Sequence, residues 1–327
     1  MVDNQILSIA RFAGIDNVSD PLNIPVSSRL TYLKTAINVD VDDERMLHRR
    51  SGRSRVYTGT PRSFWPQTDV GISFSLFLDG TSLIMMTPSY SPITLLTGLD
   101  VVSNMDFVHV NGRIYYTNGT VIGYIKNEIA TAFPSPSSDK QFKRTLKAGN
   151  YIEYYRSRLY TAIGNVMSFS DATRFYRMDL RYNHKQFDGI ITMMKAVNDG
   201  MYVSAGGKTY FLSGASPEKM SPIKVAESGA FPGSAVRVGS EEIIPGVLGD
   251  AVYWESDEGV FIGYPSGRVK NVTWNHWTPL IYPNRTSAAF RDDRGYGQYI
   301  CTYELPGNIA LDISGRFPVY TGITTIS

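Results

Sequence analysis

Cysteine, histidine and charge are all scarce in this chain. Its 327 residues include one cysteine, Cys301, and four histidines. One cysteine excludes an internal disulfide and argues against a thiolate zinc site. The histidines stand far apart in the sequence, so none has a second histidine at metal-ligand spacing or a cysteine partner to activate. We therefore predict no cofactor, no bound metal and no enzymatic activity.

Charged residues make up only 19% of the chain, and the formal net charge is +2. Such a balance does not predict a globally basic nucleic-acid binder, so any contact with a polyanion needs a local patch. No apolar run reaches the length of a membrane span. The N-terminus lacks the basic segment and apolar core of a signal peptide. These features predict a protein made in a reducing cytoplasm, without a membrane span.

Glycine and aromatic residues are plentiful, with 29 Gly, 21 Tyr and 15 Phe, which favours an all-β, turn-rich chain. One pattern recurs five times: an apolar, aromatic run, a glycine turn and a second run. One tyrosine in each unit serves as an anchor, and successive anchors lie roughly 42 to 51 residues apart, the spacing of four-stranded propeller blades. The five anchors are Tyr115, Tyr160, Tyr202, Tyr253 and Tyr299.

Two further strand–turn–strand units occupy residues 35–52 and 73–86, the second with Asp79-Gly80 as its hairpin turn. The first unit and the last, near Val319–Ile326, can also combine into one composite blade that closes the ring. We therefore predict an all-β fold, a β-propeller of six or seven blades over residues 35–327. A pair of β-sandwiches is the alternative, although its turns would be less regular in phase.

Residues 1–34 read as an irregular arm, because Asp20-Pro21 and Ile24-Pro25 interrupt any continuous helix or central strand. The arm nevertheless carries apolar side chains that need a surface to cover them. We predict that it docks on a neighbouring protein. The candidate docking residues are Ile6, Leu7, Ile9, Phe12 and Ile15.

The densest charge lies in residues 40–55, where four acidic residues precede five arginines. Guanidinium forks bind carboxylates and phosphates equally well. Two interpretations stay open: an ion-pair network within or between subunits, or a basic surface that faces the phosphates of passing DNA. A surface along which DNA slides should make few phosphate contacts. The arginines are Arg45, Arg49, Arg50, Arg53 and Arg55.

A cluster of aromatic residues, Trp274, Trp277 and Tyr282, is a candidate glycan platform. Aromatic residues more often fill the gaps between blades. Residues 256–259 (Ser-Asp-Glu-Gly) resemble the Asp-box turn of sialidases without its final aromatic residue, and we interpret them as a hairpin turn. A propeller glycosidase would need a pair of carboxylates across a central pocket.

Several segments, taken in order along the chain, resemble tailed-bacteriophage virion proteins. They include Phe12–Pro21, Thr35–Asp43 with Leu47–Gly52, and the hairpins that begin at Asn111 and Arg158. The resemblance implies a propeller of the short-tail machine, similar to nozzle or packaged-DNA stabilisation proteins of podoviruses. Such proteins form a ring below the portal and adaptor, retain the genome and conduct it during ejection.

The resemblance also implies a location and partners. The location is the virion tail. The partners are copies of the chain itself in a ring, with six copies expected, the adaptor and portal complex, tail fibres, and double-stranded DNA bound without sequence specificity. The resemblance implies no catalytic residues. The alternatives are a receptor- or glycan-binding propeller at the tail tip and a carbohydrate hydrolase.

Overall fold

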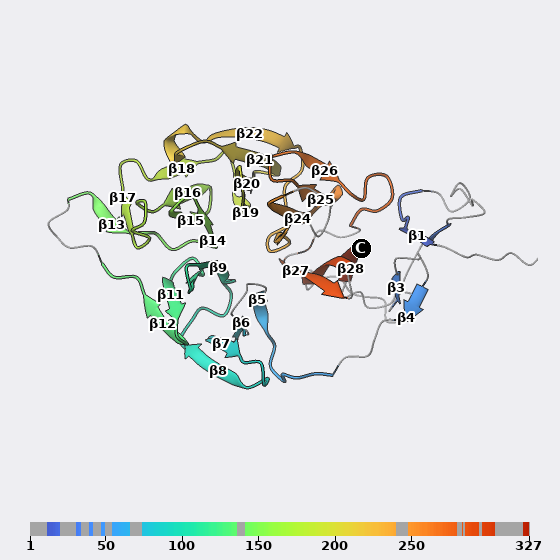
Figure 1. The fold of residues 1–327 in the computed structure, drawn as a ribbon, viewed down its shortest axis with the longest axis horizontal. Coiled ribbons are helices and arrows are strands. Elements are labelled where there is room, and N and C mark those ends of the chain that lie inside the picture. Colours follow the sequence, from blue (N-terminus) through green and yellow to red (C-terminus); the bar gives the residue numbers. More distant parts are fainter. Residues whose placement is uncertain are drawn as a thin grey trace, which may run out of the picture.

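The computed structural model describes residues 12–19, 31–33, 39–41, 47–49, 54–65, 74–135, 141–239, 248–279, 283, 285–293, 296–304 and 323–326. These residues form six antiparallel sheets arranged around a common axis (Figure 1). The all-β prediction is confirmed, and the arrangement is that of a β-propeller. Among the described residues the single helical element is one turn of 3-10 helix, η1 (Pro217–Lys219).

Within each sheet the strands lie in the order of the sequence, from the axis outward, and neighbours in this order are hydrogen-bonded. The first sheet contains β5 (Arg62–Trp65), β6 (Ser75–Asp79), β7 (Ser82–Met86) and β8 (Pro92–Leu96). The second contains β9 (Asp106–Val110), β10 (Arg113–Thr117), β11 (Ile122–Lys126) and β12 (Ile129–Ala132). The third contains β14 (Tyr151–Tyr155), β15 (Arg158–Ile163), β16 (Val166–Phe169) and β18 (His184–Gln186).

The other three sheets continue the same plan around the ring. The fourth contains β19 (Ile191–Val197), β20 (Gly200–Ala205), β21 (Lys208–Ser213) and β22 (Ser221–Ala226). The fifth contains β23 (Val236–Gly239), β24 (Asp250–Ser256), β25 (Gly259–Gly263) and β26 (Val269–Asn271). The sixth has three described strands, β27 (Arg285–Asp293), β28 (Tyr296–Glu304) and β29 (Ile323–Ile326).

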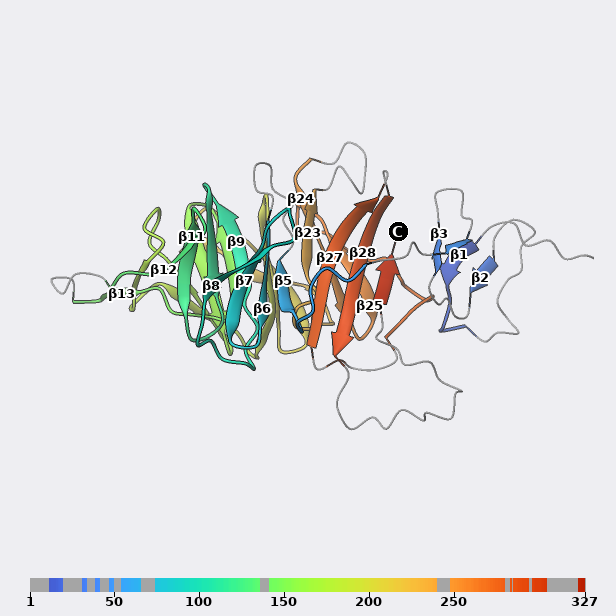
Figure 2. The same cartoon turned by 90° about the horizontal axis from the view of Figure 1, so that it is seen from below.

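Three two-stranded elements lie outside these six sheets. Strand β1 (Phe12–Ile15) pairs in parallel with β2 (Thr31–Leu33), and β3 (Val39–Val41) pairs with β4 (Leu47–Arg49). Strands β13 (Lys143–Thr145) and β17 (Arg177–Asp179) form an insertion in the third sheet. In the side view of Figure 2 the insertion and the N-terminal strands β1–β3 project from opposite sides of the row of sheets.

The hydrophobic core lies between successive sheets rather than in one central mass. In β10, Ile114 and Tyr116 pack toward the first sheet, whereas the intervening Tyr115 packs toward the third. Successive side chains of a strand point to opposite faces, and here both faces are covered. This explains why the strands read as nearly continuous apolar runs instead of alternating with polar residues.

The five anchor tyrosines occupy equivalent places, each on the second strand of its sheet. Two of them donate a hydrogen bond from the hydroxyl to carbonyl oxygens of an adjacent sheet. Tyr202 donates to the carbonyl oxygens of Tyr264 (2.7 Å) and Arg268 (3.1 Å), and Tyr299 donates to that of Ser234 (2.7 Å). The repeat in the sequence therefore marks the same strand in each of these five sheets.

Gly263 allows Tyr202 to approach the fifth sheet. A Cβ atom at this position would lie 2.6 Å from the ring of Tyr202 and 2.9 Å from that of Trp254, closer than real Cβ contacts. Glycine at this position therefore makes room for the two aromatic rings that fill the gap between the fourth and fifth sheets.

The ring closes differently from the sequence-based expectation. We expected the C-terminal run to complete the first blade, but β29 pairs with β28 in the sixth sheet. Closure occurs where β27 lies against β5, and Tyr57 covers Phe77 on the outer face of the first sheet. The β3–β4 hairpin, which we counted as a repeat unit, pairs with none of the six sheets. The free edge of β28 takes up the C-terminal strand, so no described strand of the sixth sheet pairs with the first sheet where the ring closes.

Replacing Tyr202 with Phe is expected to lower the free energy of unfolding by about 1 kcal/mol, because the hydrogen bonds from the Tyr202 hydroxyl to the carbonyl oxygens of Tyr264 and Arg268 are lost. The matched control is Tyr160→Phe, since Tyr160 is also a buried anchor but donates only to the sulfur of Met220 at 3.8 Å. Urea unfolding of both variants measures the difference. Equal losses would show that the Tyr202 hydroxyl does not hold the sheets together.

Candidate functional site

The first strand of each sheet lies nearest the axis, and four of these strands carry one charged residue in a mostly apolar run (Figure 1). The side-chain nitrogen Nζ of Lys195 on β19 lies 3.5 Å from Oδ1 of Asp106 on β9. The other carboxylate oxygen of Asp106 accepts a hydrogen bond from the amide of Ile152 on β14 at 2.9 Å. The pair thus links the second and fourth sheets past the inner strand of the third.

A second ion pair repeats this arrangement one sheet further around the ring. Nη1 of Arg237 on β23 lies 3.5 Å from Oε1 of Glu153 on β14, which links the third and fifth sheets past the fourth. Glu153 is only 2% exposed. Nε of Arg237 also lies 3.8 Å from a carboxylate oxygen of Asp250. We call Asp106, Glu153, Lys195 and Arg237 the axial charge belt.

The charged residues of the axial charge belt form ion pairs with one another. Each carboxylate meets a cation from a sheet two places away, so both signs are matched along this part of the inner wall. Burial beside Asp106 also raises the pKa of Tyr151 on β14, which keeps that phenol neutral. The belt is suited to holding sheets in register around the axis, because a matched pair presents little net charge to a ligand.

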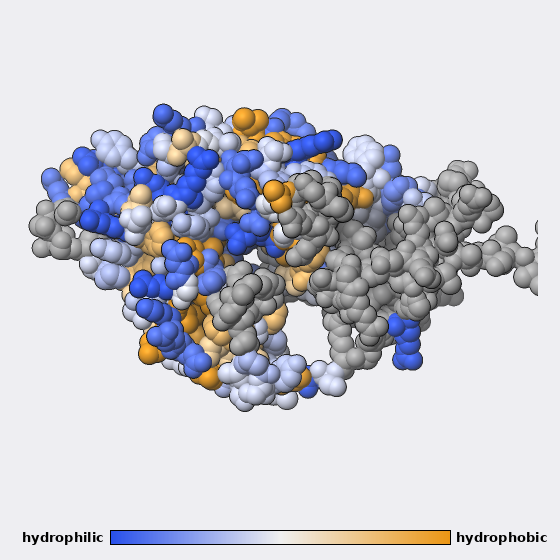
Figure 3. Space-filling view, in the orientation of Figure 1, coloured by the Kyte–Doolittle hydropathy of each residue, from blue (hydrophilic) through white to orange (hydrophobic). Residues whose placement is uncertain are grey.

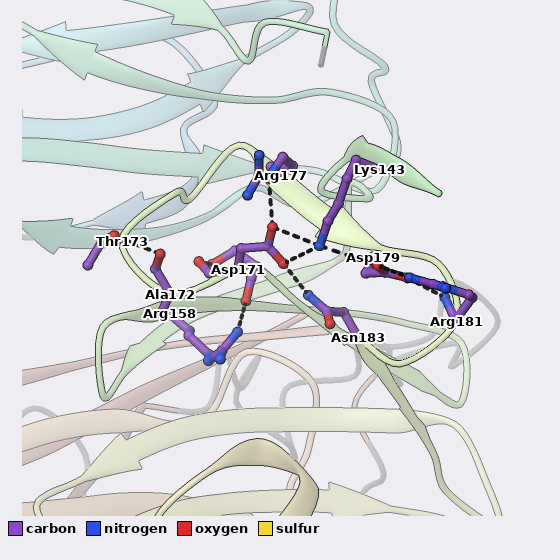
Figure 4. A network of polar contacts seen from close by, with 10 residues as sticks. Lys143, Arg158, Asp171, Ala172, Thr173, Arg177, Asp179, Arg181 and Asn183 are labelled. Atoms are coloured by element: carbon purple, nitrogen blue, oxygen red, sulfur yellow. Dashed lines mark hydrogen bonds and ion pairs between the residues drawn. The ribbon is translucent and has the colours of Figure 1, made fainter. Parts of the chain in front are cut away.

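A second polar network joins the β13–β17 insertion to the third sheet (Figure 4). Asp171 accepts hydrogen bonds from Nε of Arg177 at 2.7 Å and Nδ2 of Asn183 at 3.1 Å, and lies 3.1 Å from Nζ of Lys143. Asp179 receives two bonds from the guanidinium of Arg181, at 3.0 and 2.9 Å. Lys143 also lies 3.3 Å from Asp179 and therefore bridges both carboxylates.

These contacts control the protonation of both carboxylates. Burial alone would raise the pKa of Asp171, but the bonds from Lys143, Arg177 and Asn183 outweigh burial and hold that pKa below its usual value. The guanidinium of Arg181 lowers the pKa of Asp179 further. Both groups are ionised at neutral pH, and the turn that begins at Asp171 is fixed against the third sheet.

Positive charge gathers in the same region. Residues 141–183 contain eight lysines and arginines but three acidic residues, a surplus of five charges in a chain whose total is +2. In Figure 3 hydrophilic residues crowd the part of the surface where Figure 1 places the third sheet and its insertion. The basic residues are Lys143, Arg144, Lys147, Arg156, Arg158, Arg174, Arg177 and Arg181.

The arginines that the sequence singled out are only partly described. Arg49 is exposed at the end of β4. Arg55 donates to the carbonyl oxygens of Tyr57 (2.7 Å), Thr58 (2.6 Å) and Gly59 (3.0 Å), so it stabilises a backbone turn. These three acceptors are backbone carbonyl oxygens of the same turn. The remaining candidates, Arg45, Arg50 and Arg53, lie outside the described residues.

The described part of the predicted docking arm attaches to the chain's own propeller. Beyond β1, the amide of Asn17 donates to the carbonyl of His276 at 2.8 Å, and its side chain exchanges bonds with Thr278 at 2.9 and 3.1 Å. Tyr32 on β2 stacks on the His276 ring with centroids 4.6 Å apart. Phe12 and Ile15 lie in β1, and Ile6, Leu7 and Ile9 lie outside the described residues.

Trp274 and Trp277 of the candidate glycan platform lie in different environments. Trp274 is 64% exposed, whereas Trp277 packs against the core between the fifth and sixth sheets. Tyr282 lies outside the described residues. Asp257 sits in the tight turn between β24 and β25, as expected for a hairpin residue.

No metal-binding cluster of histidine, cysteine or acidic residues occurs among the described residues. Cys301 is fully buried in β28, and burial raises the pKa of its thiol. None of the helical residues described forms a segment long and apolar enough to cross a membrane.

Sequence reasoning missed the axial charge belt, although a signal was present. Each member is the one strongly charged side chain among apolar neighbours, as in Met193-Met-Lys195-Ala-Val. A lone charge in a strand that is buried on both faces requires a partner. The sequence does not show which partner it meets.

Comparisons with known proteins add no family and no activity to the fold described above. No family profile and no curated protein matches the chain in sequence. Among solved structures, the chain is similar to the extracellular domain of a hybrid two-component system from B. thetaiotaomicron, with a TM-score of 0.48 and 13% identity, covering 75% of this chain and 30% of that one. The chain thus spans less than a third of that protein's length.

Two further solved structures are similar over a larger share of their own length. One is a gluconolactonase from Xanthomonas campestris, with a TM-score of 0.45 and 10% identity, covering 71% of this chain and 79% of that one. The other is the Pan2 WD40 domain of Neurospora crassa, with a TM-score of 0.45 and 8% identity, covering 76% and 80%. This chain is a β-propeller, and identities this low do not transfer an activity to it.

Replacing Arg237 with Met is expected to destabilise the protein by about 2 kcal/mol, because the buried carboxylate of Glu153 loses its cation. Replacing Glu153 with Gln in the same chain should restore part of that loss. Lys224→Met is the control, since Lys224 forms an ion pair with Glu227 in which both side chains are well exposed, and should change little. Denaturant unfolding that ranks the double variant below Arg237→Met would contradict the pairing.

Replacing Asp171 with Asn is expected to destabilise the third sheet at neutral pH. Because the folded-state pKa of Asp171 is lowered, its ionisation stabilises the fold above about pH 3.8, and this contribution disappears as the pH falls through the folded-state pKa. The difference in melting temperature between the wild type and Asp171→Asn should therefore shrink in acid. The exposed Asp188→Asn serves as control. A difference that is constant from pH 7 to pH 2 would exclude this role.

Proposed function

We propose that this chain is a non-enzymatic structural component of a bacteriophage tail. Copies of the propeller pack side by side in a ring around the tail axis, as a nozzle or hub below the portal and adaptor. The ring retains the packaged genome and conducts it during ejection. Rings of identical subunits form through head-to-tail interfaces that close when the rotation per subunit divides a circle, and six copies are the expectation.

Support from the sequence comes from the ordered series of segments that resemble tailed-phage virion proteins. The segments fall on separate structural elements: the arm at β1, the β3–β4 hairpin, and the hairpins β10–β11 and β15–β16. A similarity spread over elements that pack in different places is harder to obtain by chance than one confined to a single repeat.

The observation that favours a structural role most is the axial charge belt. In a propeller with a functional channel, polar groups of the inner strands are available to a ligand. Here Asp106, Glu153, Lys195 and Arg237 are matched with one another across three sheets. With apolar clusters between the sheets, this pairing produces a stiff wedge, which a ring under pressure from packaged DNA requires.

Contact with DNA, in this proposal, falls to the outer surface of the wedge. The third sheet and its insertion hold the largest surplus of positive charge among the described residues, and Arg144 and Arg174 are exposed there. A few exposed cations attract phosphates without the many contacts that would stop DNA from sliding.

Trp274 favours one alternative, a receptor- or glycan-binding propeller at the tail tip. Its ring is 64% exposed on the loop after β26, where it is available to stack on a sugar. Trp277, which was expected to share the platform, is engaged in the core, so the surface offers a smaller aromatic area than the sequence predicted.

A cryo-electron microscopy reconstruction of the intact particle that contains this protein tests the proposal. We expect density for a ring of propellers on the tail axis, because a wedge with a matched inner wall serves assembly rather than ligand capture. The third sheet should face the channel. Propellers located on peripheral spikes would contradict the conduit and favour the receptor role, for which a glycan array with a Trp274→Ala control is the next measurement.

A further inference from the structure

A small cavity lies where the third and fourth sheets meet at one end of their strands. One side is the β14–β15 turn, Arg156-Ser157. The other is the segment Gly214–Met220, which includes η1 and connects β21 to β22. The cavity has a volume of about 300 Å³, at the lower end of the range for small-molecule sites. The axial charge belt contributes no residue to it, and Ala172 from the turn between β16 and β17 adds to its wall.

The wall of the cavity combines a buried apolar floor with a polar rim. Tyr160 and Met220 are each 1% exposed, and they contact each other across the boundary between the sheets. Ser157 and Ser216 add hydroxyl groups at the rim. The floor excludes water from one side, which strengthens electrostatic interactions with any charged group held at the rim.

Two arginines aim their guanidinium groups at the same rim. Nη1 of Arg156 donates to the carbonyl oxygen of Gly214 at 2.9 Å and so crosses to the fourth sheet. Nη1 of Arg158 donates to the carbonyl oxygen of Ser170 at 2.7 Å, as Figure 4 shows. A carbonyl fixes the orientation of a guanidinium without neutralising it. Each guanidinium has five N–H donors, of which these bonds use one.

The backbone of the Arg156-Ser157 turn, which directly precedes Arg158, adopts a strained conformation. Arg156 and Ser157 have φ angles of 44° and 62°, in the left-handed region that two-residue hairpin turns usually fill with Asn and Gly. The amide of Thr173 donates to the carbonyl of Ser157 at 2.8 Å, which ties the turn to the Asp171 network. Backbone strain that the surroundings stabilise occurs most often at binding sites.

One acidic residue, Glu218, belongs to the same neighbourhood. A hydrogen bond from Ser216 lowers the pKa of Glu218, and the charges of Arg158 and Lys185 lower it further. Arg158 and Lys185 therefore both act on this carboxylate, and with Arg156 the local charge is positive. Glu218 is exposed, so it can move aside when an anion enters.

We propose that this cavity binds a compact phosphate-bearing group through Arg156 and Arg158. Two guanidinium forks and two hydroxyls offer more donors than the two oxygens of a carboxylate can accept, whereas a phosphate has three peripheral oxygens. The volume admits a phosphate with an attached sugar, and the buried floor is suited to the sugar's less polar face. The group can come from a free phosphate ester or from a DNA backbone. The site does not depend on the proposed tail function.

Isothermal titration calorimetry at low salt, with ribose 5-phosphate, inorganic phosphate and a short DNA duplex as separate probes, tests this site. Ribose 5-phosphate is expected to bind the wild type. Arg156→Gln and Arg158→Gln should each weaken binding about tenfold or more, because each removes a charge-assisted fork. Glu218→Gln should strengthen binding, because it removes the competing carboxylate. Arg268→Gln is the matched control, because it removes the same charge from an exposed side chain outside the cavity.

The outcomes separate the sources of the phosphate. Binding of ribose 5-phosphate that depends on Arg156, without binding of the duplex, identifies a small-molecule site; duplex binding with the same dependence identifies a DNA contact. No binding by any probe at 10 mM, on the order of the weakest specific affinities, would overturn the proposal. So would equal effects of Arg156→Gln and Arg268→Gln in variants whose melting temperatures match the wild type. None of these results bears on whether the chain forms a tail ring.

Discussion

Burial of both faces of each sheet is the constraint on which the structure depends. A lone four-stranded sheet exposes two apolar surfaces, and these sheets cover them only by packing against their neighbours around the axis. Tyr202 and Tyr299 each meet this constraint with one side chain, since the ring fills a gap between sheets and the hydroxyl reaches a carbonyl of an adjacent sheet. Glycines such as Gly263 provide the space that these rings need.

The axial charge belt is a second consequence of close packing around an axis. Inner strands converge, so charged residues that are far apart in sequence come within ion-pair distance, and each pair passes one sheet to reach the next but one. Links of this kind resist rotation of one sheet against another more directly than contacts between neighbours. The same matching leaves the four residues of the belt without a surplus of charge, and a surplus appears instead on the third sheet and its insertion. The proposals of a stiff tail wedge and of a phosphate site between two sheets both follow from this division of charge.

The ring closes differently from the sequence-based prediction, which placed the C-terminal strand in the first sheet. A C-terminal strand that joins the first sheet would have closed the ring with backbone hydrogen bonds. Instead β29 extends the sixth sheet, and β27 lies near β5, with Tyr57 covering the first sheet's outer face. Among the arginines of residues 40–55, Arg55 binds carbonyl oxygens of its own turn, and both interpretations of the cluster stay predictions.

The sequence by itself determined the all-β class, the phase of the repeat and the position of most turns. These properties depend on neighbours within about ten residues: runs that are apolar on both faces, glycine or asparagine at left-handed positions, and one tyrosine per unit. Only the tertiary structure decided which charges meet. Lys195 and Asp106 are 89 residues apart and Arg237 and Glu153 are 84 apart, so no local pattern pairs them. The cavity rimmed by Arg156 and Arg158 likewise exists because the packing of two sheets brings a strained turn beside a distant loop, and electrostatic interactions depend on that distance in space rather than on separation along the chain.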